Sequence, residues 1–471
     1  MFEPARSVRE VIAFSLLALT GCTVGPDYTP PAAPEPVAPI FYGEDPELES
    51  LAQWWRSFQD PLLAELVEEG LRAAPSLEAA RQRIIAARAS REQVEAGFYP
   101  QFSADGSYTW SRGWSGSGHT GGWDKRLSAS ADARWEIDIF GGIRRSVEKA
   151  EAEEAALAYT FQDLRIALAA DIAEAYVQVR QYTAQIAIAE ANLALQERNL
   201  SRVQKRVESG DLPRYDLVTA ESQVSQTRSS IPTYRQQRAA AQFRLDQLVG
   251  RTPHATEPRL SETLDALQLP EARPKVPANE LLRRRADIRQ AEEKVRAQNA
   301  ALGVATASIY PTFSLNGSIG LSSPDLSPWS AYTRSVSFGP AVAWNIFGFG
   351  TWRKQIESAR ATLEATIQDY RATVLTAYQE AETAWLAYYN ETCRTEDLQR
   401  TVQTCAQALD IADKLYEFGE KDIEDVLSRQ SALLSAQEAL ITHRATLFTD
   451  IITLYKALGG GWSDEEKTED R

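Results

Sequence analysis

The stretch LSASADARWEIDIFGGIRR, residues 127–145, joins two patterns that require different secondary structures. Over residues 127–139, apolar and polar side chains alternate at every step, which is typical of a β-strand with one apolar and one polar face. After Gly141 and Gly142, apolar residues recur at steps of three and four, a spacing that indicates a helix packed along its length against partner helices. We therefore expect a strand that leads into a very long helix.

A second copy of this pattern occurs later in the chain. The stretch WNIFGFGTWRK, residues 344–354, matches residues 135–145, and GFYPQFSADGSYTW, residues 97–110, matches SIYPTFSLNGSIGL, residues 308–321. From the Trp135–Trp344 pair to the Gly250–Gly459 pair, matched positions differ by 209 without an insertion. The chain is therefore an internal duplication, with a unit far longer than a solenoid repeat.

Each repeat is expected to contain a helix, two strands, a long helix and a return helix. The first repeat, 61–250, has helix 61–96, strands 102–111 and 127–139, and helices 142–209 and 215–249. The second repeat, 278–459, has helix 279–308, strands 312–322 and 335–346, and helices 351–418 and 422–458. Gly210 and Gly419 are expected to reverse the chain. Residues 251–277, with five prolines, form a linker, and residues 460–471 form an acidic tail.

The strand segments carry the strongest indication of a membrane location. In residues 102–111, apolar residues from Phe102 to Trp110 alternate with serine, aspartate and threonine. About ten residues of such alternation match a transmembrane β-strand with lipid on one side and water on the other. A sheet that covers a soluble core gives the same alternation, so both readings stay open at this point. Pro340 lacks an N–H group, and a bulge or bend is expected there.

A chain with four such strands requires partners. Open sheet edges are not tolerated in lipid, so strands from several chains must close one barrel, most simply as a ring. Two chains would give eight strands and an interior filled by side chains, so a conduit needs at least three chains. Helices of about 67 residues would each extend ~100 Å, which is too long for a compact domain.

The N-terminus predicts a lipid anchor. Residues 1–21 contain a nine-residue apolar core, Val11 to Leu19, which is typical of a signal peptide and too short to span a bilayer. Leu19-Thr20-Gly21-Cys22 resembles a bacterial lipobox, in which the cysteine is acylated. The alternative is a chance cysteine beside an ordinary cleavage site. Residues 22–60, which are rich in proline, are expected to form an extended segment.

Composition excludes several classes of function. The formal net charge is −15, so no basic face is expected for nucleic acid. The three histidines lie far apart, and no HxxH or CxxC spacing indicates a metal site. Cys393 and Cys405 would lie ~18 Å apart on one helix, beyond the reach of a disulfide. No catalytic or dinucleotide-binding motif occurs, so we expect neither an enzyme nor a cofactor, apart from lipid on Cys22.

These features together resemble the TolC-like outer membrane factors of tripartite efflux pumps, in their lipoprotein branch. The stretches GCTVGPDYTPP (21–31), WWRSFQDPLLAELVEEGL (54–71) and LLRRRADIRQAE (281–292) are similar to family signatures, although Ala286 stands where the family usually has proline. The resemblance implies a mixed α+β homotrimer with a twelve-stranded β-barrel in outer membrane lipid. A periplasmic α-helical barrel would continue it toward a periplasmic adaptor protein and an inner-membrane pump.

One further stretch, YEFGEKDIEDVLSRQ at residues 416–430, resembles the periplasmic tip of TolC itself. The resemblance implies that Tyr416 and Lys421 brace a closed tip and that Asp425 lines the pore aperture. A second family aspartate falls on Ser428, and Asp422 and Glu424 could compensate for it. Alternatively, Asp425 could simply be an acidic residue at the start of a helix, where the macrodipole favours negative charge. Lys421 could likewise be a solvated side chain without a bracing role.

The expected function is a passive exit duct that carries small molecules from the periplasm to the exterior. Two alternatives remain open from the sequence: the exit duct of a type I protein secretion system, and a lipid-anchored coiled-coil structural protein without a pore. The glycine-rich loop at residues 112–125 is expected to face the cell exterior.

Overall fold

A computed structural model describes residues 23–34, 51–112, 123–260, 264, 267–270, 282–324 and 332–462. The described chain divides into two compact units. The first unit contains residues up to Ala33, Gln82–Ala158 and Gln290–Arg371, and the second contains Pro34–Arg81, Tyr159–Arg289 and Ala372–Arg471. The long helices α5 (Gly142–Glu208) and α9 (Thr351–Glu417) contribute residues to both units.

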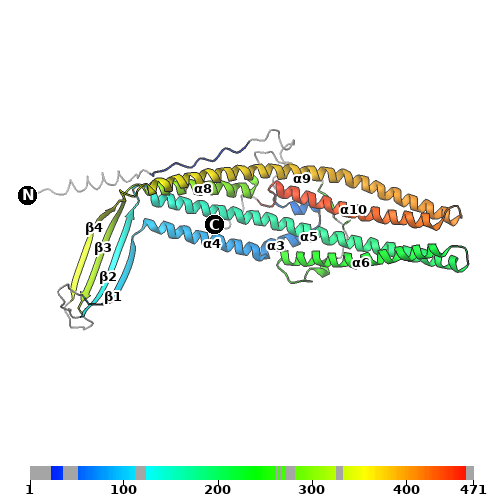
Figure 1. Cartoon of the computed structure of the whole chain (residues 1–471), viewed down its shortest axis with the longest axis horizontal. Helices are drawn as coiled ribbons and strands as arrows, with labels where there is room; N and C mark the ends of the chain where they lie inside the picture. Colours follow the sequence, from blue (N-terminus) through cyan, green and yellow to red (C-terminus); the bar gives the residue numbers. More distant parts are fainter. Residues whose placement is uncertain are drawn as a thin grey trace, which may run out of the picture. The chain divides into compact units, whose positions relative to one another are not determined.

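The first unit contains one antiparallel sheet, in which the strands follow chain order (Figure 1). The strands are β1 (Gln101–Ser111), β2 (Asp124–Ile137), β3 (Thr312–Ser323) and β4 (Thr333–Ala343). Strand β2 ends two residues before the expected boundary. The reason is that the Asp138 carboxylate accepts hydrogen bonds from the backbone N–H groups of Ile143 and Arg144, at 3.1 and 2.9 Å. Asp138 therefore starts α5 rather than ending the strand.

The expected bulge at Pro340 is wrong. The β3–β4 register runs without interruption through the Leu315–Pro340 pair, from Thr312–Ala343 to Ser322–Thr333. Strand β4 is an edge of the sheet in the single subunit, and an edge strand can accommodate a residue without an N–H group.

The duplication is visible in the helix boundaries. Helix α5 and helix α9 each contain 67 residues, and both of their ends differ by 209 positions. The return helices α6 (Arg214–Leu248) and α10 (Ile423–Ala457) each contain 35 residues and show the same difference at both ends. All four helices lie within one residue of the expected boundaries. Equal helix lengths bring the two reversals to corresponding positions in the two repeats.

The single helix expected at 61–96 is instead two helices, α3 (Pro61–Ala73) and α4 (Pro75–Glu95). Ala74 adopts an extended conformation, with φ −66° and ψ 124°, because a residue before proline is driven out of the helical region. The helix expected at 279–308 begins at Ala286 as α8 (Ala286–Ala307), after an interruption at Arg285. Residues 279–281 lie outside the described part of the chain.

The expectation of an extended segment over 22–60 is also wrong at its end. Residues 51 and 52 are helical, and Trp54–Phe58 form the 3-10 helix η1. The Trp54 ring stacks on Tyr455 with centroids 5.4 Å apart, and Phe58 packs against Phe448. Burial of these aromatic rings packs the segment against α10.

A buried polar group fixes the start of α3 within the same unit. Asp60 caps α3 by accepting hydrogen bonds from the N–H groups of Leu62 and Leu63. Its second oxygen accepts hydrogen bonds from the Tyr176 hydroxyl at 2.7 Å and from Arg180 at 3.1 Å. One carboxylate therefore ties α3 to α5, and its burial is compensated by an opposite charge. In the described residues, no helix combines the length and apolarity needed to cross a bilayer.

Candidate functional site

The two helix reversals have the same backbone geometry. Gly210 and Gly419 have φ of 83° and 77°, a left-handed conformation that costs glycine little. At each one, the N–H of the glycine donates to the carbonyl three residues before it. The N–H of the next residue donates to the carbonyl five residues before it. This is the Schellman pattern that ends a helix, and it lies between α5 and α6 at Gly210 and between α9 and α10 at Gly419.

An apolar cluster holds the two reversals together in the second unit. Its buried members are Val203, Ala220, Ala412, Tyr416, Ile423, Val426 and Leu427. They come from α5, α6, α9 and α10, so all four long helices of the subunit meet in one small core. We call this cluster the tip core.

Tyr416 is braced by a residue that the sequence did not indicate. The Tyr416 hydroxyl accepts a hydrogen bond of 2.7 Å from Arg206 Nη1, and the Arg206 guanidinium lies 5.2 Å from the centre of the Tyr416 ring. Arg206 belongs to the first repeat, where its counterpart in the second repeat is Leu415, so comparison of the repeats could not reveal it. The contact joins the last turns of α5 and α9.

Lys421 contacts Asp425 and not Tyr416. The Lys421 Nζ and Asp425 Oδ2 atoms are 3.0 Å apart, and the side chains are 50% and 38% exposed. Asp422 is the N-cap residue of α10, but its side chain makes no capping hydrogen bond, and Glu424 and Ser428 are exposed. Asp422, Glu424 and Asp425 therefore place negative charge in the first turn of α10, where the helix dipole stabilises it.

The sheet of the first unit presents one apolar and one polar face. Its register places Ala104 opposite Ala131 and Ala131 opposite Ile319, so the apolar sets of neighbouring strands share one face. The polar sets meet on the other face, where the Ser107 and Ser128 hydroxyl oxygens are 2.8 Å apart. Large apolar side chains on the first face are exposed, including Phe102, Phe338 and Val336 at 77–80%. A soluble sheet would bury such a face against a core.

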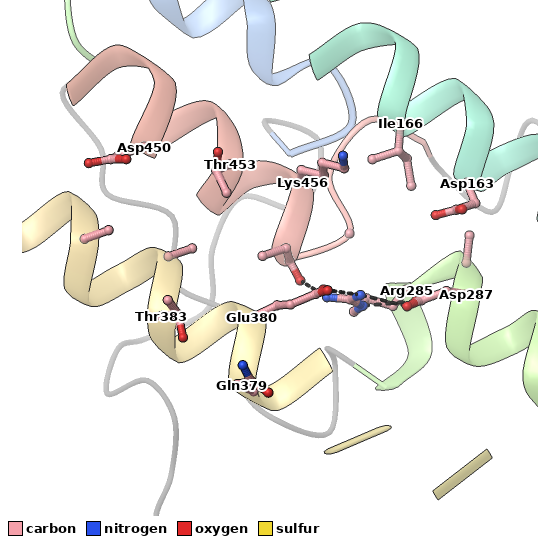
Figure 2. Close-up of a pocket in the computed structure, with 15 residues that line it drawn as sticks. Asp163, Ile166, Arg285, Asp287, Gln379, Glu380, Thr383, Asp450, Thr453 and Lys456 are labelled. Atoms are coloured by element: carbon pink, nitrogen blue, oxygen red, sulfur yellow. Dashed lines mark hydrogen bonds and ion pairs between the residues drawn. The ribbon is translucent and has the colours of Figure 1, made fainter. Parts of the chain in front are cut away.

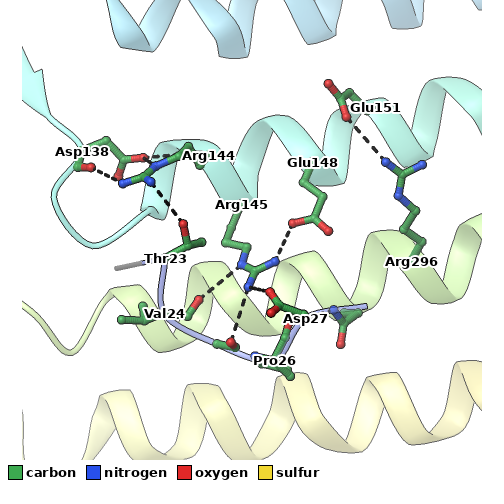
Figure 3. A network of polar contacts seen from close by, with 12 residues as sticks. Thr23, Val24, Pro26, Asp27, Asp138, Arg144, Arg145, Glu148, Glu151 and Arg296 are labelled. Atoms are coloured by element: carbon green, nitrogen blue, oxygen red, sulfur yellow. Dashed lines mark hydrogen bonds and ion pairs between the residues drawn. The ribbon is translucent and has the colours of Figure 1, made fainter. Parts of the chain in front are cut away.

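Cys22 lies outside the described residues, but the segment that follows it is docked in the first unit (Figure 3). The Val24 N–H donates to the Phe140 carbonyl at 3.1 Å, and Arg144 donates to the Thr23 hydroxyl. Within the docked segment, Gly25 packs closely against Gly303. A Cβ atom added at Gly25 would lie 2.7 Å from Gly303 Cα.

Arg145 is the main polar contact of this docked segment. Its guanidinium donates to the carbonyls of Val24 and Gly25 at 3.3 and 3.4 Å. It also pairs with Asp27 at 2.8 Å and with Glu148 at 2.7 Å, and its side chain is only 5% exposed. A charge buried to this degree requires such partners. Residues 23–27 are therefore held at the start of α5, directly after strand β2.

A cavity of about 390 Å³ lies in the second unit, lined by residues of α5, α8, α9 and α10 (Figure 2). Buried Arg285 donates to Asp287, to Glu380 at 2.6 Å and to the carbonyl of Ala457. Burial raises the pKa of Asp163, and the neighbouring Asp287 adds to this effect. Burial, together with Glu391, raises the pKa of Asp450 to about 6. Ala286, which replaces the usual proline, is buried against Ile166 and Trp462.

Two other chemical expectations concern ions and thiols. Cys393 and Cys405 are both free. Across the described ranges, no three histidine, cysteine, aspartate or glutamate residues gather in a way that could hold a metal ion.

The loop between β1 and β2 includes residues 113–122, which lie outside the described residues. The orientation of this loop therefore stays a prediction.

Comparison with known proteins gives consistent matches over nearly the whole chain. Residues 66–251 and 278–460 match the family model of the outer membrane efflux proteins. Nodulation protein T of Rhizobium leguminosarum bv. trifolii is 29% identical over 447 residues, covering 91% of this chain and 92% of the relative. The cation efflux system protein CusC of Escherichia coli O6:H1 is 28% identical, with coverage of 95% and 97%.

A solved structure matches the fold as well. The outer-membrane channel OprN is 30% identical and superimposes with a TM-score of 0.82, over 94% of this chain and 100% of that structure. The chain belongs to the outer membrane efflux protein family. This membership confirms the expected fold class, the outer membrane location and the role as the outer membrane channel of an efflux system.

Proposed function

We propose that this chain is one third of a lipid-anchored exit duct that passes small molecules passively from a periplasmic pump assembly to the exterior. Three copies would contribute twelve strands to one closed barrel and twelve long helices to a periplasmic tunnel. The observation that carries the proposal is a four-stranded sheet with an exposed apolar face and two unpaired edges, attached to two 67-residue helices. Such a sheet is stable in lipid only when its edges are closed.

The tip core supports a gate at the helix reversals. The charges of Asp422 and Asp425 would recur three times around one axis, where like charges repel and cations concentrate. Contacts such as Arg206–Tyr416 would then hold the tip closed against this repulsion. A groove of about 370 Å³ between α6 and α10, lined by residues including Thr219, Gln223 and Ser431, lies beside the tip and suits a periplasmic adaptor protein. An inner-membrane pump would supply the energy.

The docked segment at Arg145 supports the lipid anchor. Residues 23–27 are fixed at the point where strand β2 gives way to α5, and in a barrel this point lies at the membrane surface. An acylated Cys22, one residue away, would insert its chains into the adjoining lipid leaflet, and several chains give firm anchoring.

Planar-bilayer recording tests the duct and its gate. The purified parent should insert as a trimer with low, cation-selective conductance. Arg206→Ala and Tyr416→Phe should each raise the conductance, and Asp425→Asn should lower cation selectivity. Lys414→Ser is the matched control, because Lys414 pairs only with Asp410 on the exposed face of α9 in the described residues. A parent that inserts without conducting would contradict the duct, and conductance unchanged in all variants would place the gate elsewhere.

Gene deletion tests the substrate class. Loss of the chain should sensitise cells to small toxic molecules or ions, and the sensitivity should be rescued by the parent. A deletion that leaves sensitivity unchanged but abolishes export of one protein would instead support a type I secretion duct.

A further inference from the structure

The apolar face of the sheet carries a positive charge on strand β2. Residues that are opposed in neighbouring strands share a face, and Trp110, a member of the apolar set of β1, is opposed to Lys125. Lys125 therefore lies on the apolar face. It lies at the end of the sheet where β1 leads into β2, away from the end where β2 leads into α5 (Figure 1).

Strand β4 carries a second positive charge on the same face. The strand spans Thr333–Ala343 rather than the expected 335–346, so Arg334 belongs to it. Arg334 is opposed to Leu321, a member of the apolar set of β3. In the four described strands, Lys125 and Arg334 are the only charged residues on the apolar face.

The two basic residues are counterparts in the duplication. The shift of 209 positions that relates the repeats takes Lys125 to Arg334. It also takes Trp123 to Tyr332. Each hairpin thus has an aromatic residue, one intervening residue and a cation at the start of its second strand. The same chemistry occurs twice on one face and at one end of the sheet.

The cations lie among exposed aromatic rings. Lys125 Nζ is 5.4 Å from the centre of the Trp110 ring, and the Arg112 guanidinium is 5.8 Å from the centre of the Trp123 ring. Trp110, Trp123 and Tyr332 are 63%, 60% and 51% exposed. Tryptophan and tyrosine are enriched at the level of lipid headgroups, so these rings indicate where the membrane boundary crosses the sheet.

Strand length places the basic residues at the second boundary of the membrane. Lys125 and Trp135 lie ten positions apart in β2, and Arg334 and Trp344 have the same separation. At ~3.3 Å per residue and a strand tilt of ~40°, ten residues extend ~25 Å along the membrane normal. The apolar band of an outer membrane barrel has this height. The tryptophans therefore mark one boundary, and the cations reach the other.

We infer that Lys125 and Arg334 bind phosphate groups of the bisphosphorylated glycolipid in the outer leaflet, lipid A, at two sites in each subunit. This inference rests on the proposed duct, in which the helices extend into the periplasm and the opposite end of the sheet faces the exterior. The arginine fork matches two phosphate oxygens, and lysine supplies a point charge. The acyl chains of the lipid would cover the apolar residues between the two boundaries.

The placement of the charges favours a lipid with phosphate on one leaflet. Long basic side chains can extend toward water from either boundary of a membrane, so solvation alone would allow cations at both ends of the apolar face. In the described strands, both basic residues of this face lie at the outer end. Neither forms an ion pair with a carboxylate of the described residues, so both remain available to an anionic headgroup.

Binding of radiolabelled lipid A to the full-length trimer in neutral detergent tests the inference. Lys125→Gln and Arg334→Gln should each weaken binding ~5-fold, equivalent to about 1 kcal/mol per cation, and the double variant should weaken it ~25-fold. Lys125→Arg should retain binding. Arg126→Gln is the matched control, because Arg126 is the next residue and lies on the polar face. It should leave binding unchanged.

The number of phosphates provides a second measurement. The parent should bind bisphosphorylated lipid A more tightly than monophosphorylated lipid A, and the double variant should lose this preference. Equal weakening by Arg126→Gln and Lys125→Gln would show a general effect of charge and overturn the inference. Equal or tighter binding of phosphatidylglycerol would overturn the assignment to the outer-leaflet lipid. Displacement of lipid A by millimolar inorganic phosphate would show a site for free phosphate and overturn it as well.

Conductance of the parent trimer, recorded in parallel, separates this inference from the duct. A conducting trimer whose lipid A binding is unchanged in the double variant would overturn lipid recognition and leave the duct intact. A trimer that loses lipid A binding as expected, but whose parent never conducts, would contradict the duct and support lipid recognition.

Discussion

The starts of the two long helices share a backbone and differ in their surroundings. Gly141 and Gly350 precede them with φ of 80° and 79°. One turn on, Arg145 pairs with Glu148 and Lys354 pairs with Glu357, each at 2.7 Å. The Arg145 side chain is 5% exposed and the Lys354 side chain is 79% exposed.

The difference comes from a segment that was not duplicated. Residues 23–27 cover the start of α5, and in the described part of the chain no corresponding segment lies against Gly350 at the start of α9. Arginine suits the covered position because its planar fork can donate to two carbonyls and two carboxylates, whereas lysine is a single charge. The duplicated backbone thus supplies two equivalent helix starts, and the side chains at one of them are specialised to hold residues 23–27.

The largest effect is expected for Arg145→Ala. Loss of the hydrogen bonds to the Val24 and Gly25 carbonyls and of two ion pairs should weaken docking of residues 23–27 by about 2 kcal/mol, or ~30-fold in amide exchange. Hydrogen exchange of the Val24 amide, which donates to Phe140, reports this directly. Lys354→Ala, the counterpart substitution at an exposed pair, should leave exchange in residues 23–34 unchanged. Equal responses to the two substitutions would remove the proposed distinction.

Next in size is the difference between Gly141→Ala and Gly350→Ala. Both substitutions place alanine in the left-handed region, at a cost of about 1 kcal/mol. Only at Gly141 would the new Cβ lie 2.8 Å from Thr23 Cγ2 and 3.0 Å from Thr23 Cα, since nothing lies within 4 Å at Gly350. Gly141→Ala should therefore also release the docked segment, seen as faster exchange of the Val24 amide. Undisturbed exchange in this variant would show that Thr23 does not rest on Gly141.

The comparison extends along the helices to Asp450, whose counterpart in the first repeat is Ala241. Because the pKa of Asp450 is raised to about 6 in the folded chain, by burial and by Glu391, the folded state binds the proton more tightly than the unfolded state does. Its contribution to stability is thus fully present below about pH 4 and is lost as the pH rises to about 6.

Replacing Asp450 with the residue of the first repeat should remove this dependence. We compare the free energy of unfolding of Asp450→Ala with that of the parent at each pH. After allowance for solvent screening, this difference should be about 1 kcal/mol more favourable to the variant at pH 7.5 than at pH 4.5. Denaturation of the trimer at the two pH values measures this difference. The substitution Asp450→Asn keeps the side-chain size and should behave in the same way. A difference independent of pH would show that Asp450 is ionised throughout.

The smallest effect is expected at the tip. Lys421 corresponds to Leu212, a partly buried neighbour of the tip core, and its exposed ion pair with Asp425 is worth only ~0.3–0.5 kcal/mol. Lys421→Leu, which makes the second reversal resemble the first, should therefore change the melting temperature of the trimer by a degree or less. Tyr416→Phe, which removes the hydrogen bond to Arg206, should lower it more. A larger loss for Lys421→Leu would reveal a partner of Lys421 beyond its own subunit.

The sequence alone determined the repeating architecture of this protein. Strict alternation in residues 127–139 and steps of three and four in the long helices are local patterns, and each selects one secondary structure by its period. A constant shift of 209 positions then fixed the boundaries of α5, α6, α9 and α10 to within one residue. Glycine at 210 and 419 marked the reversals because few other residues adopt a positive φ.

Tertiary structure decided which side chains meet across the repeats. Arg206 donates a hydrogen bond to Tyr416, and Arg145 donates hydrogen bonds to residues 24–27. Each contact joins residues more than 100 positions apart in the sequence. Neither contact has a periodic signature, since each joins residues from different segments only after four helices or a strand–helix junction have packed. Likewise, burial of Trp54 and Phe58 against α10 folded a segment that proline content had marked as extended. Local patterns fix the backbone, and only packing selects the partners of single side chains.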